Sequence, residues 1–352
     1  MFTRNPQNPL IKPTQIAASR PDWEVIGVFN PGVAQVGDET LLLVRVAERP
    51  AQTDRAWIAC PTVDERGEVI LHRVRRDDPA WDTRDPRIVR HRHSGAVYLT
   101  SLSHIRRARS HDGIHFTVEA GPWLFPQSPL EAFGVEDMRV TPLDDAWLLN
   151  YSAVSGHGIA TALATTRDFE HIERLGIGFP PSNRDVTVFP RRIGGQYAAY
   201  HRPMPGEFGR YSIWLATSPD LLRWGDHRPV LEGQGGWEAG RVGGGAPPLW
   251  MPEGWLVIYH AADAQQRYCL GAFLAAHDDP SRILARCPLP ILSPEKDYET
   301  EGFFGKVVFT CGALLRDGVV RVYYGASDET IALAEAPLNA ILESLREGAG
   351  VR

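Results

Sequence analysis

The chain has 352 residues, of which 43% are hydrophobic and 23% are charged, and its formal net charge is −6. This composition is typical of an ordinary globular protein, and the acidic balance argues against nucleic-acid or membrane-surface partners. The four cysteines are widely spaced and form no CxxC pair, which argues against a zinc site. No apolar run is long enough for a membrane helix or a signal core. We therefore expect a cytoplasmic protein with unpaired, mostly buried thiols.

Short apolar strands follow one another in pairs along most of the chain, separated by turns rich in Gly, Pro, Asp and Asn. Six such pairs can be counted, with turns at 37–39, 93–95, 144–145, 194–195, 252–254 and 317–318. Further strand signals that end in a Ser or Thr, an Asp turn and an aromatic residue lie at 107–116, 162–169 and 213–224. Units of roughly 40 to 50 residues with about four strands are typical of β-propeller blades.

Helical periodicity is confined to the end of the chain, where apolar residues at helical spacing follow Pro337. We find no linker and no low-complexity segment. The sequence therefore predicts one all-β propeller domain over residues 1–352, with an N-terminal extension at 1–25 and a C-terminal helix or tail at 336–352.

An acidic residue beside an arginine recurs at the start of apolar stretches, at 84–88, 134–140 and 183–190. Repeated sheet units that bring charged residues to one place suggest a polar site on a central axis. Asp137 is the first candidate for chemistry. On an extended strand it shares a face with Arg139, while Glu136 points away. The alternative, at about even weight, is a structural Asp–Arg pair that joins neighbouring blades.

A second group of candidate residues is basic and aromatic, and its members lie near the ends of predicted strands. The group consists of Arg184, Arg202, Arg241, His260 and Tyr268. If the blade ends converge, these side chains could surround one anion, since the guanidinium fork suits phosphate. Taken singly, each is more simply a surface cation or a satisfied core residue.

Several acidic residues occupy predicted loops: Glu238, Asp263, Glu299, Glu301 and Asp328. Asp328 follows two tyrosines at the end of a strand pair, which is typical of a sugar-binding position and equally of a blade ending. The sequence has no nucleophile elbow, no GxxxxGK[ST] loop and no HExxH motif. It implies no metal.

In motif blocks over nearly its whole length, the chain resembles glycoside hydrolase family 130, the β-mannoside phosphorylases and related β-1,2-mannosidases. The blocks lie at 30–33, 43–46, 134–140, 184–190, 201–203, 243–248, 259–260, 294–299, 307–312 and 323–328. The chain departs from the family pattern with Met138 for Pro, Lys306 and Thr310 for Asn and Pro, and Arg241 where Lys is common. These departures bear on the acceptor sugar and on the choice between phosphate and water.

The resemblance implies a five-bladed propeller, so the sixth pair, at 87–102, could complete the first blade. It also implies inverting phosphorolysis of a β-mannoside to α-mannose 1-phosphate, with inorganic phosphate as co-substrate and no cofactor. Asp137 would be the general acid, its proton passing through a sugar hydroxyl. The substrate would be a β-1,2-linked manno-oligosaccharide or a mannosyl-glucose or mannosyl-N-acetylglucosamine type, and the protein could form a homo-oligomer.

The resemblance also distributes the binding roles. Phosphate would be held by Arg184, Arg202, Arg241, His260 and Tyr268. The sugar would be held by Asn30, Arg45, Asp85, Arg139, Asp185, His201 and Asp328.

Two alternatives remain open. Inverting hydrolysis needs a base roughly 6.5 to 9.5 Å from the acid, for which Glu238, Glu299 and Glu301 are candidates. Phosphorolysis needs a cationic pocket instead and is favoured. A sugar-binding propeller without activity would keep Asn30, Arg45 and Asp328 but would not need Asp137 as an acid.

Overall fold

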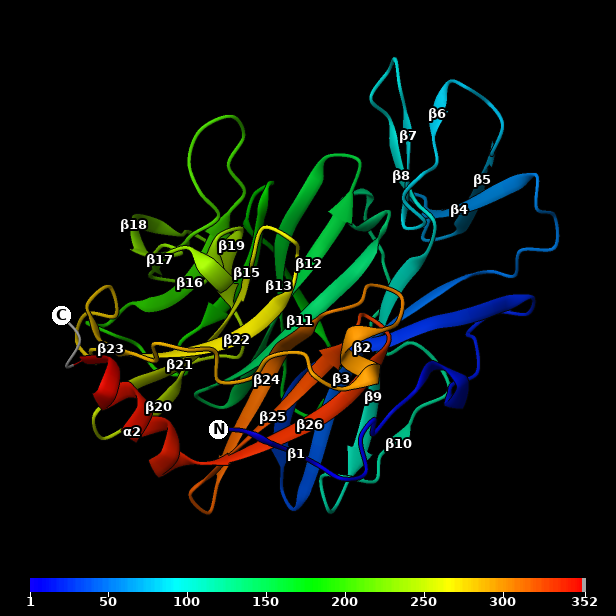
Figure 1. The fold of residues 1–352 in the computed structure, drawn as a ribbon. Coiled ribbons are helices and arrows are strands. Elements are labelled where there is room, and N and C mark those ends of the chain that lie inside the picture. The colour runs from blue at the N-terminus through cyan, green and yellow to red at the C-terminus, as the bar shows by residue number, and fades with distance from the viewer. Residues whose placement is uncertain (350–352) are drawn as a thin grey trace.

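The structure is a computed structural model that describes residues 1–349. The prediction of an all-β fold is confirmed, because strands build the body of the molecule and its helices are short (Figure 1). The α-helices are α1 (Asp297–Thr300) and α2 (Leu338–Ala349), and the 3-10 turns are η1 (Pro13–Gln15), η2 (Pro129–Glu131) and η3 (Gly236–Glu238). The predicted C-terminal helix is thus present as α2, which packs against β22 (Tyr268–Ala275) and β23 (Ile283–Arg286).

The largest sheet consists of two groups of antiparallel strands. The first group is β2 (Trp23–Val36), β3 (Glu39–Pro50), β9 (Leu102–Ser110) and β10 (Thr117–Val118). The second is β11 (Gly134–Leu143), β12 (Ala146–Ser155), β13 (Gly158–Thr166) and β14 (Glu173–Phe179). One parallel pairing, between Gly134 and Ser103, joins the groups. A Cβ at Gly134 would lie 2.8 Å from the Ser103 backbone, so this approach requires glycine.

Three further sheets complete the main body. One contains β15 (Asn183–Val188), β16 (Tyr197–Pro203), β17 (Ile213–Ser218) and β18 (Gly225–Leu231). The next contains β19 (Arg241–Gly244), β20 (Leu249–Met251), β21 (Gly254–Ala262), β22 and β23, with β19 and β20 both paired to β21. The last contains β24 (Val308–Arg316), β25 (Val319–Ala326), β26 (Thr330–Pro337) and the N-terminal β1 (Thr3–Arg4).

An inserted module lies between β3 and β9 and stands apart from the main body at the upper right of Figure 1. It has one sheet of β4 (Trp57–Val63) and β5 (Val69–Arg75), and another of β6 (Trp81–Asp82), β7 (Ile88–His91) and β8 (Val97–Leu99). The sixth predicted pair, at 87–102, falls mainly on β7 and β8. Because these strands pair only within the module, the expectation that this pair completes the first unit is wrong.

The predicted hairpin turns of the main body are confirmed, and their residues adopt the left-handed backbone that tight turns require. Asp144 has φ 46°, Gly194 has φ 58° and Asp317 has φ 52°. Apolar side chains of neighbouring sheets fill the space between them, and all four cysteines are buried and free. Among the described helices, none combines the length and apolar character needed to cross a bilayer.

A bulge interrupts the first strand of three units at the same relative place. The register shifts between Phe29 and Gly32 in β2, between Glu136 and Arg139 in β11, and between Arg184 and Thr187 in β15. Within these bulges Asn30, Asp137 and Asp185 have φ of 49°, 52° and 56°. Asn and Asp tolerate this conformation better than other side chains. The repeated bulge turns one polar side chain per unit toward its neighbours.

Candidate active site

Asp137 is buried, and its carboxylate is held by two side chains from β2 and β3. Asn30 Nδ2 donates to Asp137 Oδ1 at 2.9 Å, and Arg45 Nη1 donates to the same oxygen at 3.0 Å. Burial raises the pKa of Asp137, but the charges of Arg45 and Arg139 and the Asn30 hydrogen bond outweigh burial, so its pKa lies below the ordinary aspartate value. Asp137 is therefore ionised in the free protein at neutral pH.

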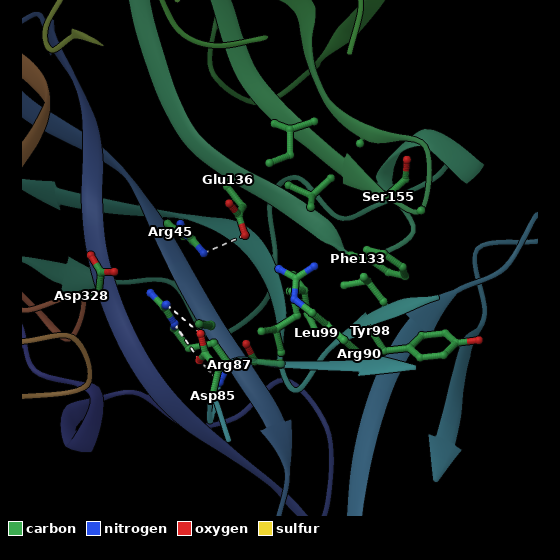
Figure 2. Close-up of a pocket in the computed structure, with 18 of the residues that line it drawn as sticks. Arg45, Asp85, Arg87, Arg90, Tyr98, Leu99, Phe133, Glu136, Ser155 and Asp328 are labelled. Atoms are coloured by element: carbon green, nitrogen blue, oxygen red, sulfur yellow. Dashed lines mark hydrogen bonds and ion pairs between the residues drawn. The ribbon is translucent and has the colours of Figure 1, made fainter. Parts of the chain in front are cut away.

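Glu136 lies beside Asp137 at the site, contrary to the alternation expected from an extended strand. The bulge between Glu136 and Arg139 breaks that alternation, and Arg45 Nη2 donates to Glu136 Oε1 at 2.7 Å. Figure 2 shows this contact within the cavity. Sequence reasoning missed Glu136 because no pattern of apolar residues in the sequence marks a bulge of this kind.

Arg139 does not pair with the Asp137 carboxylate. Its guanidinium is buried and donates to the backbone oxygens of Asp137, Gly244 and Gly245 at 2.9, 3.0 and 3.2 Å. Its Nη2 also lies 3.5 Å from Asp185 Oδ1. These contacts join β11 to β15 and β19, which agrees with the alternative in which an arginine locks neighbouring units together.

Asp185 holds the second charged cluster together. Its Oδ2 lies 3.0 Å from Arg202 Nη2 and 3.3 Å from His260 Nε2. Burial raises the pKa of Asp185, but the charge of Arg202 and the hydrogen bond from His260 reverse the effect, so its pKa is strongly lowered. The pKa of His260 is lowered chiefly by burial, which keeps its imidazole neutral.

The predicted basic and aromatic residues do come together. Tyr211, which sequence reasoning missed, has the Arg202 and Arg241 guanidinium carbons 5.6 and 5.3 Å from its ring centroid. Tyr268 lies 5.8 Å from the Arg241 guanidinium. Several buried guanidinium nitrogens of the described chain have no protein hydrogen-bond acceptor: Arg184 Nε, Arg202 Nε and Nη1, and Arg241 Nε. Such a cluster of unused donors is suited to an oxyanion.

A cavity of about 810 Å³ opens beside these charged groups (Figure 2). Its lining includes Arg45, Glu136, Arg184 and Asp328 from the main body. Burial raises the pKa of Asp328 to about 6; the charge of Arg45 opposes this shift and that of Asp137 adds to it. The cavity has the size and mixed lining of a small-molecule site, and Arg184 connects it to the cationic cluster.

The remaining predicted sugar ligands occupy different surroundings. Asp85 lines the cavity from the loop before β7 and accepts hydrogen bonds from Arg87, with Arg87 Nη2 at 2.9 Å from Asp85 Oδ2. His201 is buried, contacts Asn183 and His227 through its ring nitrogens at 2.9 and 3.0 Å, and does not line the cavity. Burial lowers the pKa of His201 to about 3.

Glu238 and Glu299 belong to a buried arrangement that three units repeat. In each unit a glutamate from η2, η3 or α1 accepts hydrogen bonds from a tyrosine hydroxyl of the second strand, from an arginine of the outermost strand and from a backbone N–H four residues earlier. The sets are Glu131 with Tyr151, Arg174 and Gln127; Glu238 with Tyr259, Arg286 and Gln234; and Glu299 with Tyr324, Arg4 and Glu295. Glu301 is exposed, and none of the three candidate bases lines the 810 Å³ cavity.

The site holds no cluster of three or more His, Cys, Asp or Glu side chains arranged as metal ligands, and the same is true throughout residues 1–349. The side chains that the described site brings together are carboxylates, guanidinium groups, the neutral imidazole of His260 and the phenol of Tyr268.

Residues 95–347 match the model of glycoside hydrolase family 130, described as beta-1,4-mannooligosaccharide phosphorylase. The chain is 45% identical over 346 residues to a beta-1,2-mannobiose phosphorylase of Listeria innocua, covering 97% of this chain and 98% of that protein. It is 37% identical to a 1,2-beta-oligomannan phosphorylase of Thermoanaerobacter, covering 68% and 80% of the two chains.

The solved structures agree with the sequence relatives. The beta-1,2-mannobiose phosphorylase of Listeria innocua in complex with beta-1,2-mannobiose superposes with a TM-score of 0.95, 44% identity and coverage of 98% and 99% of the two chains. A 20% identical glycoside hydrolase that targets beta-1,2 mannosidic linkages in Candida mannan has a TM-score of 0.74, covers 96% and 94%, and shows the shared fold alone. The chain therefore belongs to glycoside hydrolase family 130.

Proposed function

We propose that the protein is an inverting phosphorylase that converts β-1,2-mannobiose and inorganic phosphate into α-mannose 1-phosphate and mannose. The observation that carries this proposal is the junction at Arg184, where the cavity that contains Arg45 and Glu136 meets a cluster of buried arginines with unused donors. The Listeria innocua relative, which matches almost the full chain, supports the β-1,2 linkage.

Asp137 is the proposed general acid. In the reaction a phosphate oxygen forms a bond to the anomeric carbon while the bond to the glycosidic oxygen breaks. The leaving oxygen receives a proton that originates on Asp137 and passes through a sugar hydroxyl. Since Arg45 and Arg139 lower the pKa of Asp137, the bound phosphate dianion offsets their field and favours the protonated acid.

Phosphate is held by the cationic cluster of Arg184, Arg202, Arg241, His260 and Tyr268. Arginine forks donate paired hydrogen bonds to phosphate oxygens, and the glycines of β19 let the backbone approach: a Cβ at Gly243 would lie 2.6 Å from His260 Cε1. The low pKa of Asp185 keeps one negative charge beneath this cluster and orients Arg202 and His260.

The mannosyl unit at the reaction centre is bound by Asn30, Arg45 and Asp328, with Glu136 and Asp85 on the same cavity. The family resemblance places Arg139, Asp185 and His201 among the sugar ligands, but they are better understood as supports. Arg139 holds backbone oxygens of a neighbouring unit, Asp185 holds Arg202 and His260, and His201 does not line the cavity. Phosphorolysis needs no base, because the nucleophile is already an anion.

Hydrolysis is the second candidate reaction, and the described site supports it less. It requires a carboxylate that activates water. Glu238 and Glu299 are engaged in the repeated Glu–Tyr–Arg arrangement, and Glu301 is exposed. A sugar-binding protein without activity would have no use for the cationic cluster.

The fold that we propose is a single five-bladed β-propeller. Its support is the grouping of the main-body strands into five consecutive antiparallel units, the last of which takes up β1 from the start of the chain. The cytoplasmic location and the homo-oligomer stay predictions.

Product analysis with β-1,2-mannobiose, with and without phosphate, tests the proposal. We expect one mannose and one α-mannose 1-phosphate per disaccharide, formed only when phosphate is present. Two mannose units per disaccharide, at a rate indifferent to phosphate, would establish a hydrolase instead.

A further inference from the structure

The inserted module forms a wall of the cavity opposite the proposed reaction centre. Ile88 and Arg90 of β7 and Tyr98 and Leu99 of β8 line it, across from Arg45 and Glu136 (Figure 2). Tyr98 also packs against Phe133 of the main body, with ring centroids 6.1 Å apart. A segment inserted between two strands of one unit therefore completes the site.

Arg90 is presented to the cavity by the alternation of β7. Val89 is fully buried in the small core of the module with Ile58, Cys60 and Val74, so Ile88 and Arg90 point the other way. Register pairing of Val89 with Tyr98 and of Arg90 with Val97 fixes this orientation. The Arg90 guanidinium thus stands on a packed sheet and projects into the cavity (Figure 2).

The two arginines that β7 and its preceding loop place on this wall differ in their contacts. Arg87 donates from Nε and Nη2 to Asp85 at 3.0 and 2.9 Å, and it lies 4.4 Å over the Phe304 ring. The exposed side chain of Arg90 enters none of the side-chain hydrogen bonds or ion pairs of residues 1–349, although it lines the same cavity. Its donors are available to a ligand.

We propose that Arg90 binds the mannose that leaves in phosphorolysis and accepts in the reverse reaction, and so helps to determine the acceptor. The inference rests on the proposed function. A mannose linked through O2 keeps adjacent free hydroxyls at C3 and C4, and a planar guanidinium can donate to two neighbouring oxygens at once. Ile88, Leu99 and Phe133, which line the same cavity, supply the apolar surface against which a pyranose ring packs.

The test is the reverse reaction, followed as phosphate released from α-mannose 1-phosphate with mannose as acceptor. We expect Arg90→Gln to raise the KM for mannose roughly 10- to 100-fold and to leave the KM for α-mannose 1-phosphate unchanged. Arg90→Lys should give an intermediate value. The matched control is Arg75→Gln, which removes an exposed guanidinium of the same module that pairs with Asp77 and should match the wild type.

Acceptor analogues make the test independent of how well the variants fold. Wild-type enzyme should discriminate against 3-deoxy- or 4-deoxymannose, and Arg90→Gln should lose most of that discrimination. An unchanged acceptor KM in Arg90→Gln, an equal rise for donor and acceptor, or equal use of mannose and both deoxymannoses by the wild type would overturn the inference alone. Absence of phosphate release with the wild type would overturn the proposed function, and this inference with it.

Discussion

Glu136 and Asp137 share one guanidinium. Arg45 Nη2 lies 2.7 Å from Glu136 Oε1, and Arg45 Nη1 lies 3.0 Å from Asp137 Oδ1. Neighbouring residues of a regular strand point to opposite faces, so this sharing depends on the bulge that gives Asp137 its positive φ. The backbone irregularity is what places a candidate acid, its charge partner and a second carboxylate at one point.

Replacing Asp137 by Asn should remove the general acid and little else. Asn tolerates the positive φ of this position, so the fold should persist, while turnover of β-1,2-mannobiose should fall by about 10²- to 10⁴-fold. Initial rates of α-mannose 1-phosphate formation measure the loss, and disaccharide binding should remain detectable by calorimetry. Turnover close to that of the wild type would assign the acid elsewhere.

Removing one arginine of the cationic cluster should weaken phosphate binding selectively. We expect Arg241→Gln to raise the KM for phosphate roughly 10- to 100-fold with a smaller change in the KM for the disaccharide. Arg282→Gln, which removes an exposed guanidinium paired with Asp278, is the matched control. An equal change in both Michaelis constants would place Arg241 outside the phosphate site.

Asp328 should make the protein less stable as pH rises. Its folded pKa of about 6 exceeds the ordinary value of 3.8, so the folded state holds a proton that the unfolded state has released between these values. Stability from this group is therefore lost as pH rises from about 4 to 6. Urea unfolding should show Asp328→Asn gaining stability relative to the wild type across that interval and keeping the gain at pH 7.

Other carboxylates of the protein titrate in both proteins and cancel in this difference. A difference in unfolding free energy between Asp328→Asn and the wild type that does not change with pH would show that Asp328 titrates normally.

Glu238 and Glu299 should matter for stability and not for the chemical step. Each is a buried carboxylate between a tyrosine and an arginine, and breaking such a buried pair costs about 3 to 5 kcal/mol. Glu238→Gln and Glu299→Gln should therefore unfold at lower urea concentration, while the kcat of the folded enzyme stays unchanged. Glu301→Gln, at an exposed position, is the control. If one of these variants is stable but loses most of its kcat, the replaced glutamate would again be a candidate base for hydrolysis.

The sequence was informative about the fold because turns and apolar pairs are local signals. The hairpin turns at Asp144, Gly194 and Asp317 lie where Asp and Gly favour a left-handed backbone, and each was predicted. The repeated acidic signal at Asp137 and Asp185 was also genuine, since both residues occupy equivalent bulges. Asn30 occupies a third bulge. Because its side chain is an amide, the repeated acidic pattern did not reveal that its position is equivalent to those of Asp137 and Asp185.

The third copy of that signal, at 84–88, misled for a physical reason. Its carboxylate and arginine are two residues apart and bind each other within one loop: Arg87 N and Nε both donate to Asp85 Oδ1. Such a local turn needs no equivalent strand, so the pattern says nothing about blade number. The Glu–Tyr–Arg sets could not be predicted from the sequence. Their members lie far apart in the chain and come together only when the strands of a unit pack.

The last sheet is built from both ends of the chain, since Thr3 and Arg4 of β1 pair with Glu335 and Ala334 of β26. Arg4 also binds Glu299 beneath that sheet. A ribosome releases the first of these strands long before its partner. During synthesis the earlier units can form as they emerge, while β1 stays unpaired until β26 has been made. The sheet that takes up β1 is therefore the last sheet of the main body to be completed.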